Sequence, residues 1–217
     1  MRCGDAKSRK SPYLEIMMRR FLILLVCLAP VFATSALAQE KLPLSAISDY
    51  LNRMATAQSP FTQINDDGSL STGTLYLKRP GRMRFEYDPP EKALVVAGGG
   101  TVVVHDPKSN QPPETYPLKR TPLSIILAST VDLGRANMVV GHSFDGTATV
   151  VTAQDPENPE YGSIDLMFTD KPVELRKWVV HDANGGQTSV ILGGLKTGAP
   201  LSDTLFVTQS VGGRAGR

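Results

Sequence analysis

Two adjacent His-Asp pairs are the residues of this chain whose chemistry first suggests a metal site. They are His105-Asp106 and His181-Asp182, and imidazole and carboxylate groups are both common ligands of zinc. Each pair stands at the end of an expected strand beside a turn, and no further ligands accompany it at metal-binding spacing. We therefore expect no metal ion, and we place these residues at solvated strand ends.

The sequence also lacks the common signatures of catalysis. There is no Gly-x-Ser-x-Gly elbow, and the run Gly98–Gly100 precedes an expected strand, whereas a phosphate-binding loop opens a helix. Both cysteines, Cys3 and Cys27, fall in a segment that we expect to be removed, which leaves no thiolate nucleophile and no disulfide. The sequence therefore predicts a protein that is not an enzyme and that needs no cofactor.

The N-terminal segment has the pattern of an export signal. Met18 is followed by Arg19-Arg20, then by the apolar run Phe21–Leu28, and later by the small-x-small site Ala36-Leu37-Ala38. A positive start, a short apolar run and small residues at the cleavage site define a secretory signal peptide. We therefore expect export, with a mature chain that begins near Gln39.

A lipid anchor at Cys27 is not expected. Val26 precedes this cysteine, where lipid modification requires a small residue.

The length that remains after cleavage of the signal peptide suits one domain. The expected organisation is therefore an upstream extension from a mis-called start, a signal peptide and a single domain, over residues 1–17, 18–38 and 39–217.

The charge of the chain argues against a nucleic-acid-binding protein. The full sequence has 23 Lys and Arg against 21 Asp and Glu, and the first 38 residues hold six of the former and two of the latter. The remainder therefore has 17 basic and 19 acidic residues, a net charge of −2. Binding to nucleic acid requires a concentrated basic face, which this composition does not favour.

The elements that position any functional group are mostly short strands. In Gly73–Pro90, apolar and polar residues alternate on both sides of Arg79-Pro80-Gly81, which has turn chemistry. This pattern predicts a hairpin with one apolar face. Val173–Val180 alternates cleanly, with Leu175 and Trp178 on opposite faces, apart from Lys177 on the apolar face. Further strands are expected from Phe61 onward and over Ala93–Ala97, Thr101–His105, Asn137–Phe144, Thr147–Ala153, Ser163–Thr169, Val173–Val180, Thr188–Leu192 and Thr204–Val207.

Two helices are expected among these strands. Pro43–Ala57 has apolar residues at helical spacing with Ser45 as its cap, and Thr121-Pro122 opens an apolar helix that Val131–Leu133 extends by a turn. About eleven strands joined by short turns indicate an antiparallel meander. A sheet of this length curls, and it then closes, splits into a sandwich or is filled by helices.

The motif LKRPGRMRFEYDPP resembles the signature of the LolA family, periplasmic carriers of outer-membrane lipoproteins. The Phe61-Thr62-Gln63 step and His105-Asp106-Pro107 extend the resemblance, which covers essentially the whole mature chain in order. It implies a mainly β fold with some α. The specific architecture is an unclosed antiparallel half-barrel of about eleven strands, with helices covering a concave apolar cavity.

The resemblance also implies a site. Arg79 matches the arginine that holds the lid helices shut in that family, with oxygens of Thr121–Leu133 as partners, whereas the residues alone indicate a solvated turn arginine. Met83 and Phe85 match a cavity-facing pair in which Phe and Trp are more common. Further cavity candidates, for which core packing is an equal alternative, are Leu75, Leu77, Leu94, Val96, Ile126 and Leu127.

The function implied by the resemblance is transport without covalent chemistry. A monomeric periplasmic carrier takes triacylated lipoproteins from an inner-membrane lipoprotein-releasing transporter and passes them to an outer-membrane receptor or to the membrane itself. Two alternatives remain open at this point. One is a lipid- or glycolipid-binding protein with other cargo, and the other is a sensor of mislocalised lipoproteins.

Overall fold

The structure is a computed structural model that describes residues 41–134 and 137–210. The upstream extension, the signal peptide, Gln39 and both cysteines discussed above lie outside these residues. Among the helices of the two described stretches, none combines the length and the apolar character that a membrane crossing requires.

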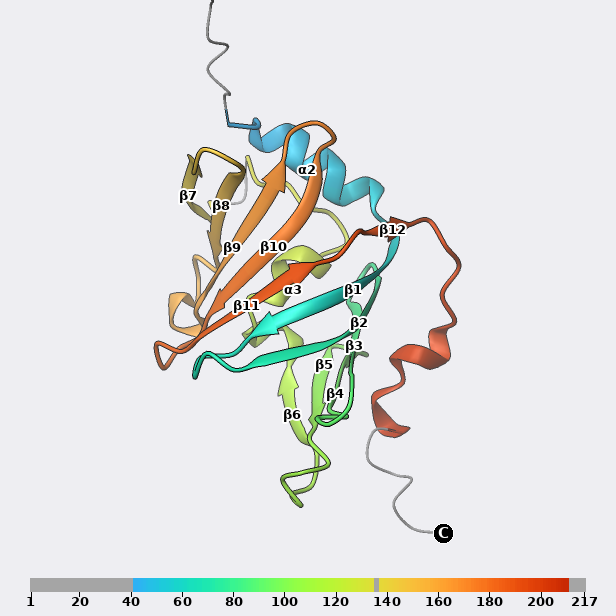
Figure 1. Ribbon diagram of the computed structural model, residues 1–217. Helices are drawn as coiled ribbons and strands as arrows, with labels where there is room; N and C mark the ends of the chain where they lie inside the picture. Colours follow the sequence, from blue (N-terminus) through green and yellow to red (C-terminus); the bar gives the residue numbers. More distant parts are fainter. Residues whose placement is uncertain (1–40, 135–136, 211–217) are drawn as a thin grey trace, which may run out of the picture. The chain divides into compact units, whose positions relative to one another are not determined.

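The strands fall into two consecutive meanders (Figure 1). The first comprises β1 (Thr56–Ile64), β2 (Leu70–Lys78), β3 (Arg82–Tyr87), β4 (Leu94–Gly98), β5 (Thr101–His105) and β6 (Glu114–Pro117). The second comprises β7 (Val139–Phe144), β8 (Thr149–Gln154), β9 (Ser163–Thr169), β10 (Glu174–His181) and β11 (Gln187–Leu192), and is followed by the short β12 (Lys196–Thr197).

All described strands belong to one antiparallel sheet. Its order is β6-β5-β4-β3-β2-β1-β11-β10-β9-β8-β7, and β12 pairs with the start of β1. The two meanders join where β1 pairs with β11. Within the described residues the sheet ends at β6 and β7, so the predicted unclosed half-barrel is confirmed.

The concave side of the sheet is covered by helices. Helix α3 (Leu123–Leu127) lies inside the curve and α2 (Leu44–Arg53) crosses one end of it, as Figure 1 shows. The capping residues differ from expectation, because Pro43 and Pro122 occupy the N-cap positions. The hydroxyl of Thr121 instead donates to the Leu118 carbonyl, in the 3-10 turn Leu118–Arg120 (η1).

Strand β1 begins five residues earlier than the sequence suggests, at Thr56 rather than Phe61. Pro60 therefore lies inside a strand, although it cannot donate a ladder hydrogen bond. The pairing explains why it fits: β12 is bonded to Ala57 and Gln58, and β11 takes over from Phe61. Pro60 stands in the gap, and its carbonyl accepts a bond from the Gly193 amide.

A β-bulge in β10 interrupts the alternation that was expected there apart from Lys177. Alternation places Leu175 and Trp178 on opposite faces, but the pairing with β9 shifts register between Leu175 and Lys177. An extra residue on one strand reverses the direction of every side chain that follows it. Leu175 and Trp178 are therefore both buried in the core, each 1% exposed, while Lys177 stays opposite Met167.

The C-terminal region is not a strand as expected. Asp203–Phe206 and Thr208–Ser210 form the 3-10 turns η3 and η4, and a further short 3-10 turn, η2, spans Pro159–Tyr161. The expected helical turn at Val131–Leu133 is also wrong, because those residues form an irregular segment. Residues 201–206, which we call the C-terminal strap, run over the outer face of β3 and β4.

Candidate functional site

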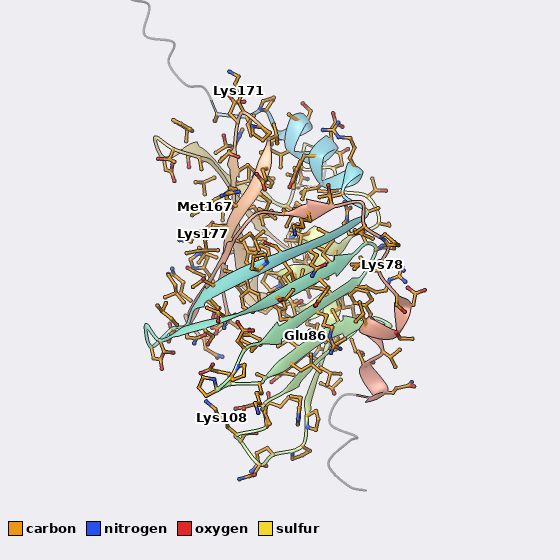
Figure 2. The ribbon with its side chains drawn as sticks, turned by 45° about the vertical axis from the view of Figure 1, so that its right-hand side comes forward. Lys78, Glu86, Lys108, Met167, Lys171 and Lys177 are labelled. Carbon is orange, nitrogen blue, oxygen red and sulfur yellow. The ribbon has the colours of Figure 1, made fainter. Side chains whose placement is uncertain are left out.

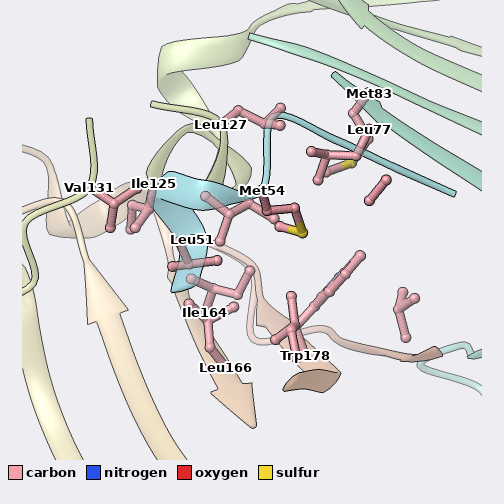
Figure 3. Packing of buried hydrophobic residues seen from close by; sticks show 14 of the residues in the cluster. Leu51, Met54, Leu77, Met83, Ile125, Leu127, Val131, Ile164, Leu166 and Trp178 are labelled. Atoms are coloured by element: carbon pink, nitrogen blue, oxygen red, sulfur yellow. The ribbon is translucent and has the colours of Figure 1, made fainter. Parts of the chain in front are cut away.

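The concave face of the sheet is apolar and packed against the two helices. Helix α2 contributes Ile47 and Leu51, and α3 contributes three consecutive apolar residues, Ile125–Leu127. Figure 3 shows Leu51 of α2 together with Ile125 and Leu127 of α3, close to Ile164, Leu166 and Trp178 of the sheet. Six of the predicted cavity residues belong to this cluster, and each is at most 5% exposed: Leu75, Leu77, Met83, Phe85, Ile126 and Leu127.

The remaining two predicted cavity residues, Leu94 and Val96, lie on the other face. Leu94 pairs with Glu86 and Val96 pairs with Arg84, so both share the outer face with those charged residues. Val96 is buried there because the η3 turn packs against β4. The sequence alternation was correct for the strand, but the face was assigned to the wrong set of residues.

Arg79 lies at the end of the β2–β3 hairpin, half-buried beneath both helices. Its Nε and Nη2 atoms are 3.2 Å and 2.6 Å from the Ala128 carbonyl oxygen, which follows α3. Its Nη1 donates to the Leu51 carbonyl in the last turn of α2, and Nη2 also reaches the Asn52 side chain at 3.4 Å. One guanidinium group therefore joins the ends of both helices to the sheet.

The chemistry of helix ends explains why an arginine suits this position. The last carbonyls of a helix have no partner inside the helix and carry partial negative charge. Arginine has five N–H donors in a planar fork and can serve two such carbonyls together. The backbone of the same turn adds a third contact, since the Gly81 amide donates to the Leu127 carbonyl at 2.9 Å.

Burial lowers the pKa of the Arg79 guanidinium from its ordinary value. That ordinary value is so high that arginine keeps its charge at neutral pH. The guanidinium therefore stays charged although it is partly buried, and hydrogen bonds from an ionised donor are about twice as strong as those between neutral groups. These contacts depend on the helices remaining in place, because both acceptors are backbone carbonyls at helix ends.

Two polar residues of α2 that sequence reasoning missed bind the segment after α3. Asn52 donates to the Val131 carbonyl at 2.8 Å and accepts from the Val131 amide at 2.9 Å. The Ser48 hydroxyl accepts from the Leu133 amide at 3.0 Å. The two residues are four apart on one flank of α2, a spacing that could have signalled a shared partner. A cavity of about 280 Å³ lies beside these contacts.

The far end of the concave face opens into a cavity of about 400 Å³. A chain of hydrogen bonds lines it: Tyr87 donates to Gln63 at 2.7 Å, and Gln63 donates to Asn65 at 2.6 Å. Burial raises the pKa of Tyr87 to about 12, because its anion would lose hydration. Phe61 packs edge-on against the Tyr87 ring and marks where the apolar interior begins.

Two of the three histidines are hydrogen-bonded within the fold, whereas the Nδ1 atom of His105 is buried without a hydrogen-bond partner among the described residues. His181 bonds to Asp165 across β9 and β10 at 2.8 Å, rather than to its neighbour Asp182, whose carboxylate accepts turn amides. The His142 ring bonds to the Leu42 carbonyl at 2.8 Å. In residues 41–134 and 137–210, no three His, Cys, Asp or Glu side chains group closely enough to hold a metal ion.

Comparisons with known proteins show what this chain is similar to. The family model for the outer membrane lipoprotein carrier protein LolA matches residues 52–209. An outer-membrane lipoprotein carrier protein of Azotobacter vinelandii is 25% identical over 197 residues, covering 87% of this chain and 94% of the relative. One from Coxiella burnetii is 27% identical over 169 residues, covering 74% of this chain and 79% of the relative.

Among solved structures, a putative outer membrane lipoprotein-sorting protein domain from Vibrio parahaemolyticus is similar at a TM-score of 0.47 and 9% identity. The similarity covers 77% of this chain and 96% of that one. The family model alone spans well over half of the sequence, and the matched residues include both Arg79 and Ala128. This chain therefore belongs to the LolA family.

Proposed function

We propose that this protein is a periplasmic carrier that binds the acyl chains of lipoproteins between its sheet and its covering helices. In this proposal α2 and α3 act as a lid over the concave apolar face. The bonds from Arg79 to the Leu51 and Ala128 carbonyls act as a latch that keeps the empty carrier closed. The described structure then corresponds to the closed, unloaded state.

The observation that carries the proposal is the placement of Arg79. A single charged side chain bonds the ends of two helices, and the surface below those helices is apolar. A latch built of polar bonds to backbone carbonyls can be exchanged for bonds to water when the lid opens. The apolar surface below the helices cannot form bonds to water, so it is covered more favourably either by the closed lid or by an apolar ligand.

The energetics suit a carrier that works without nucleotide. Burial of acyl chain stabilises a complex by about 0.8 kcal/mol per methylene, so a triacylated cargo offers a large driving force. Lid closure competes with that gain for the same apolar surface. Only a difference in affinity between open and closed states can then drive release to an acceptor.

The family relationship supports the route of transport. The relatives are named outer-membrane lipoprotein carrier proteins, and the sequence predicts export by a signal peptide. We infer a single-domain monomer that receives cargo from an inner-membrane transporter and delivers it to an outer-membrane receptor or membrane. No covalent step is needed for such a role, in agreement with a family of carriers rather than enzymes.

Binding of an apolar fluorescent dye tests the proposal. The mature protein is expected to bind the dye saturably, and a synthetic triacylated lipopeptide is expected to displace it, while the same peptide without acyl chains does not. Absence of saturable dye binding would refute a carrier with an accessible apolar site. Mass spectrometry of cargo captured from periplasm separates the alternatives, since glycolipids or free lipids in place of lipoproteins would contradict the proposed cargo.

A further inference from the structure

Two basic residues flank the latch turn on the outer face of the sheet. Lys78 ends β2 and Arg82 begins β3, and the two are directly opposite each other in the hairpin register. Like charges at directly opposed positions repel and destabilise a strand pair. The two repelling residues therefore border the turn formed by Arg79, Pro80 and Gly81.

Asp203 of the C-terminal strap lies between these two cations. Its Oδ1 atom is 2.7 Å from the Lys78 Nζ and 2.5 Å from an Arg82 guanidinium nitrogen. Figure 2 shows Lys78 on the face of the sheet beside which the C-terminal segment passes. One carboxylate thus converts a repulsive pair into a bridged pair, and the two cations hold the pKa of Asp203 below its usual range.

The strap is held in register with the hairpin by further contacts. Lys78 also donates to the Leu201 carbonyl at 2.7 Å, and Arg84 donates to the Leu205 carbonyl at 3.0 Å. Phe206 is only 4% exposed and anchors the strap beside Gly98, where its carbonyl leaves no room for a side chain. Asp203 is therefore positioned by neighbours on both sides, although its own side chain is 71% exposed.

We propose that Asp203 is a positioning residue for the Arg79 latch, acting through Lys78 and Arg82. The inference rests on the proposed lid, and it adds a control from the outer face of the sheet. Arg79 holds the helices from the inner side of the turn, and Asp203 holds the two strand ends that orient the turn. Loss of the bridge lets the strand ends separate and weakens the contacts of the turn with both helices.

Salt dependence follows directly from the exposure of the bridge. Interactions between exposed charges are screened strongly as ionic strength rises. High salt is therefore expected to weaken the contacts of the turn with the helices in the parent protein, as removal of the Asp203 charge does, but to a smaller extent. The contacts of Arg79 with carbonyls under the helices are more sheltered, so they respond less to salt.

Hydrogen exchange of the Gly81 amide reports on the contact of the Arg79 turn with α3, because this amide bonds to the Leu127 carbonyl. Asp203→Asn is expected to speed this exchange about three- to tenfold, as loss of two exposed ion pairs would. Asp203→Glu keeps the charge and is expected to restore protection. The matched control Glu157→Gln removes one exposed carboxylate from the β8–β9 loop and is expected to change nothing.

Added salt and a double variant complete the test. Salt is expected to raise the Gly81 exchange rate of the parent toward that of Asp203→Asn, and to leave that variant unchanged. In an Arg79→Leu background, Asp203→Asn is expected to add no further increase. Amides of β9, far from the turn, report global stability and are expected to stay protected in every variant.

Two outcomes would overturn the inference. Unchanged Gly81 exchange in Asp203→Asn would show that the bridge does not position the turn. An equal increase with and without Arg79 would show that Asp203 acts independently of the latch. Neither result bears on dye binding, so the carrier proposal is judged separately, by whether the parent protein binds the dye and the acylated peptide and by the cargo it captures.

Discussion

The Arg79 guanidinium contacts the Ala128 carbonyl through two nitrogens, Nη2 at 2.6 Å and Nε at 3.2 Å. These residues are 49 positions apart, and the bond joins the β2–β3 turn to the end of α3. The same side chain reaches the Leu51 carbonyl on α2. Because both helices converge on one residue, the strength of a single side chain's bonds influences whether the concave face is covered.

Arg79→Leu is expected to tighten binding of an apolar dye or acylated peptide about tenfold to a hundredfold. The lost charge-assisted bonds contribute about 1.5–3 kcal/mol to the closed state, and 1.4 kcal/mol corresponds to a factor of ten. Release to acceptor membranes should slow to the same extent. Fluorescence titration and a transfer assay measure the two effects.

Arg53→Leu is the matched control for that variant, since Arg53 is an exposed arginine at the same end of α2. It is expected to leave binding and transfer at parental values. Arg53→Leu should melt close to the parent, because exposed substitutions usually change stability by about 0.5 kcal/mol, whereas Arg79→Leu should melt lower, because the bonds it removes stabilise the closed folded state. If Arg79→Leu transfers cargo like the parent, Arg79 has no part in gating.

Asn52→Ala is expected to loosen the segment that follows α3. It removes both bonds to Val131, and each contributes about 0.5–1.5 kcal/mol. Hydrogen exchange of the Val131 amide should accelerate about tenfold, at 1.4 kcal/mol per factor of ten. Ser45→Ala, at an exposed position of the same helix, should leave that amide protected, and equal acceleration in both variants would contradict the assignment.

Gly98→Ala is expected to destabilise the protein by about 1–3 kcal/mol, the usual cost of overpacking. A Cβ at this position would lie 2.2 Å from the Phe206 carbonyl oxygen, so the strap must shift. Gly134→Ala is the control, because its Cβ would meet only the Asp132 side chain at 3.5 Å. Urea denaturation compares them, and equal midpoints would show that the strap yields without cost.

Stability is expected to fall as pH rises from about 10 to 12. Tyr87 has a folded-state pKa of about 12, above its unfolded value of 10.0, so the folded state retains its proton more strongly. The stabilisation is complete below pH 10 and is lost as the pH approaches 12; two pKa units correspond to about 2–3 kcal/mol. Tyr87→Phe should flatten this decline in urea midpoints, and an unchanged slope would exclude Tyr87 as its cause.

Much of the fold followed from local patterns in the sequence. Alternation on both sides of Arg79-Pro80-Gly81 predicted the β2–β3 hairpin, and the run Gly98–Gly100 predicted the turn between β4 and β5. These signals are reliable because strand pleating and turn dihedrals involve only neighbouring residues. The sequence alone therefore determined that Arg79 lies at a turn and that Met83 and Phe85 share an apolar strand face.

Contacts between distant segments were decided only by the tertiary structure. The inward or outward direction of Val96 depends on its pairing with Arg84, and that of Trp178 depends on a bulge opposite β9. The same holds for Asp203, which meets Arg82 across 121 positions of sequence. Alternation defines two faces of a strand but not which one is covered, because burial depends on register and on the segments that pack above it.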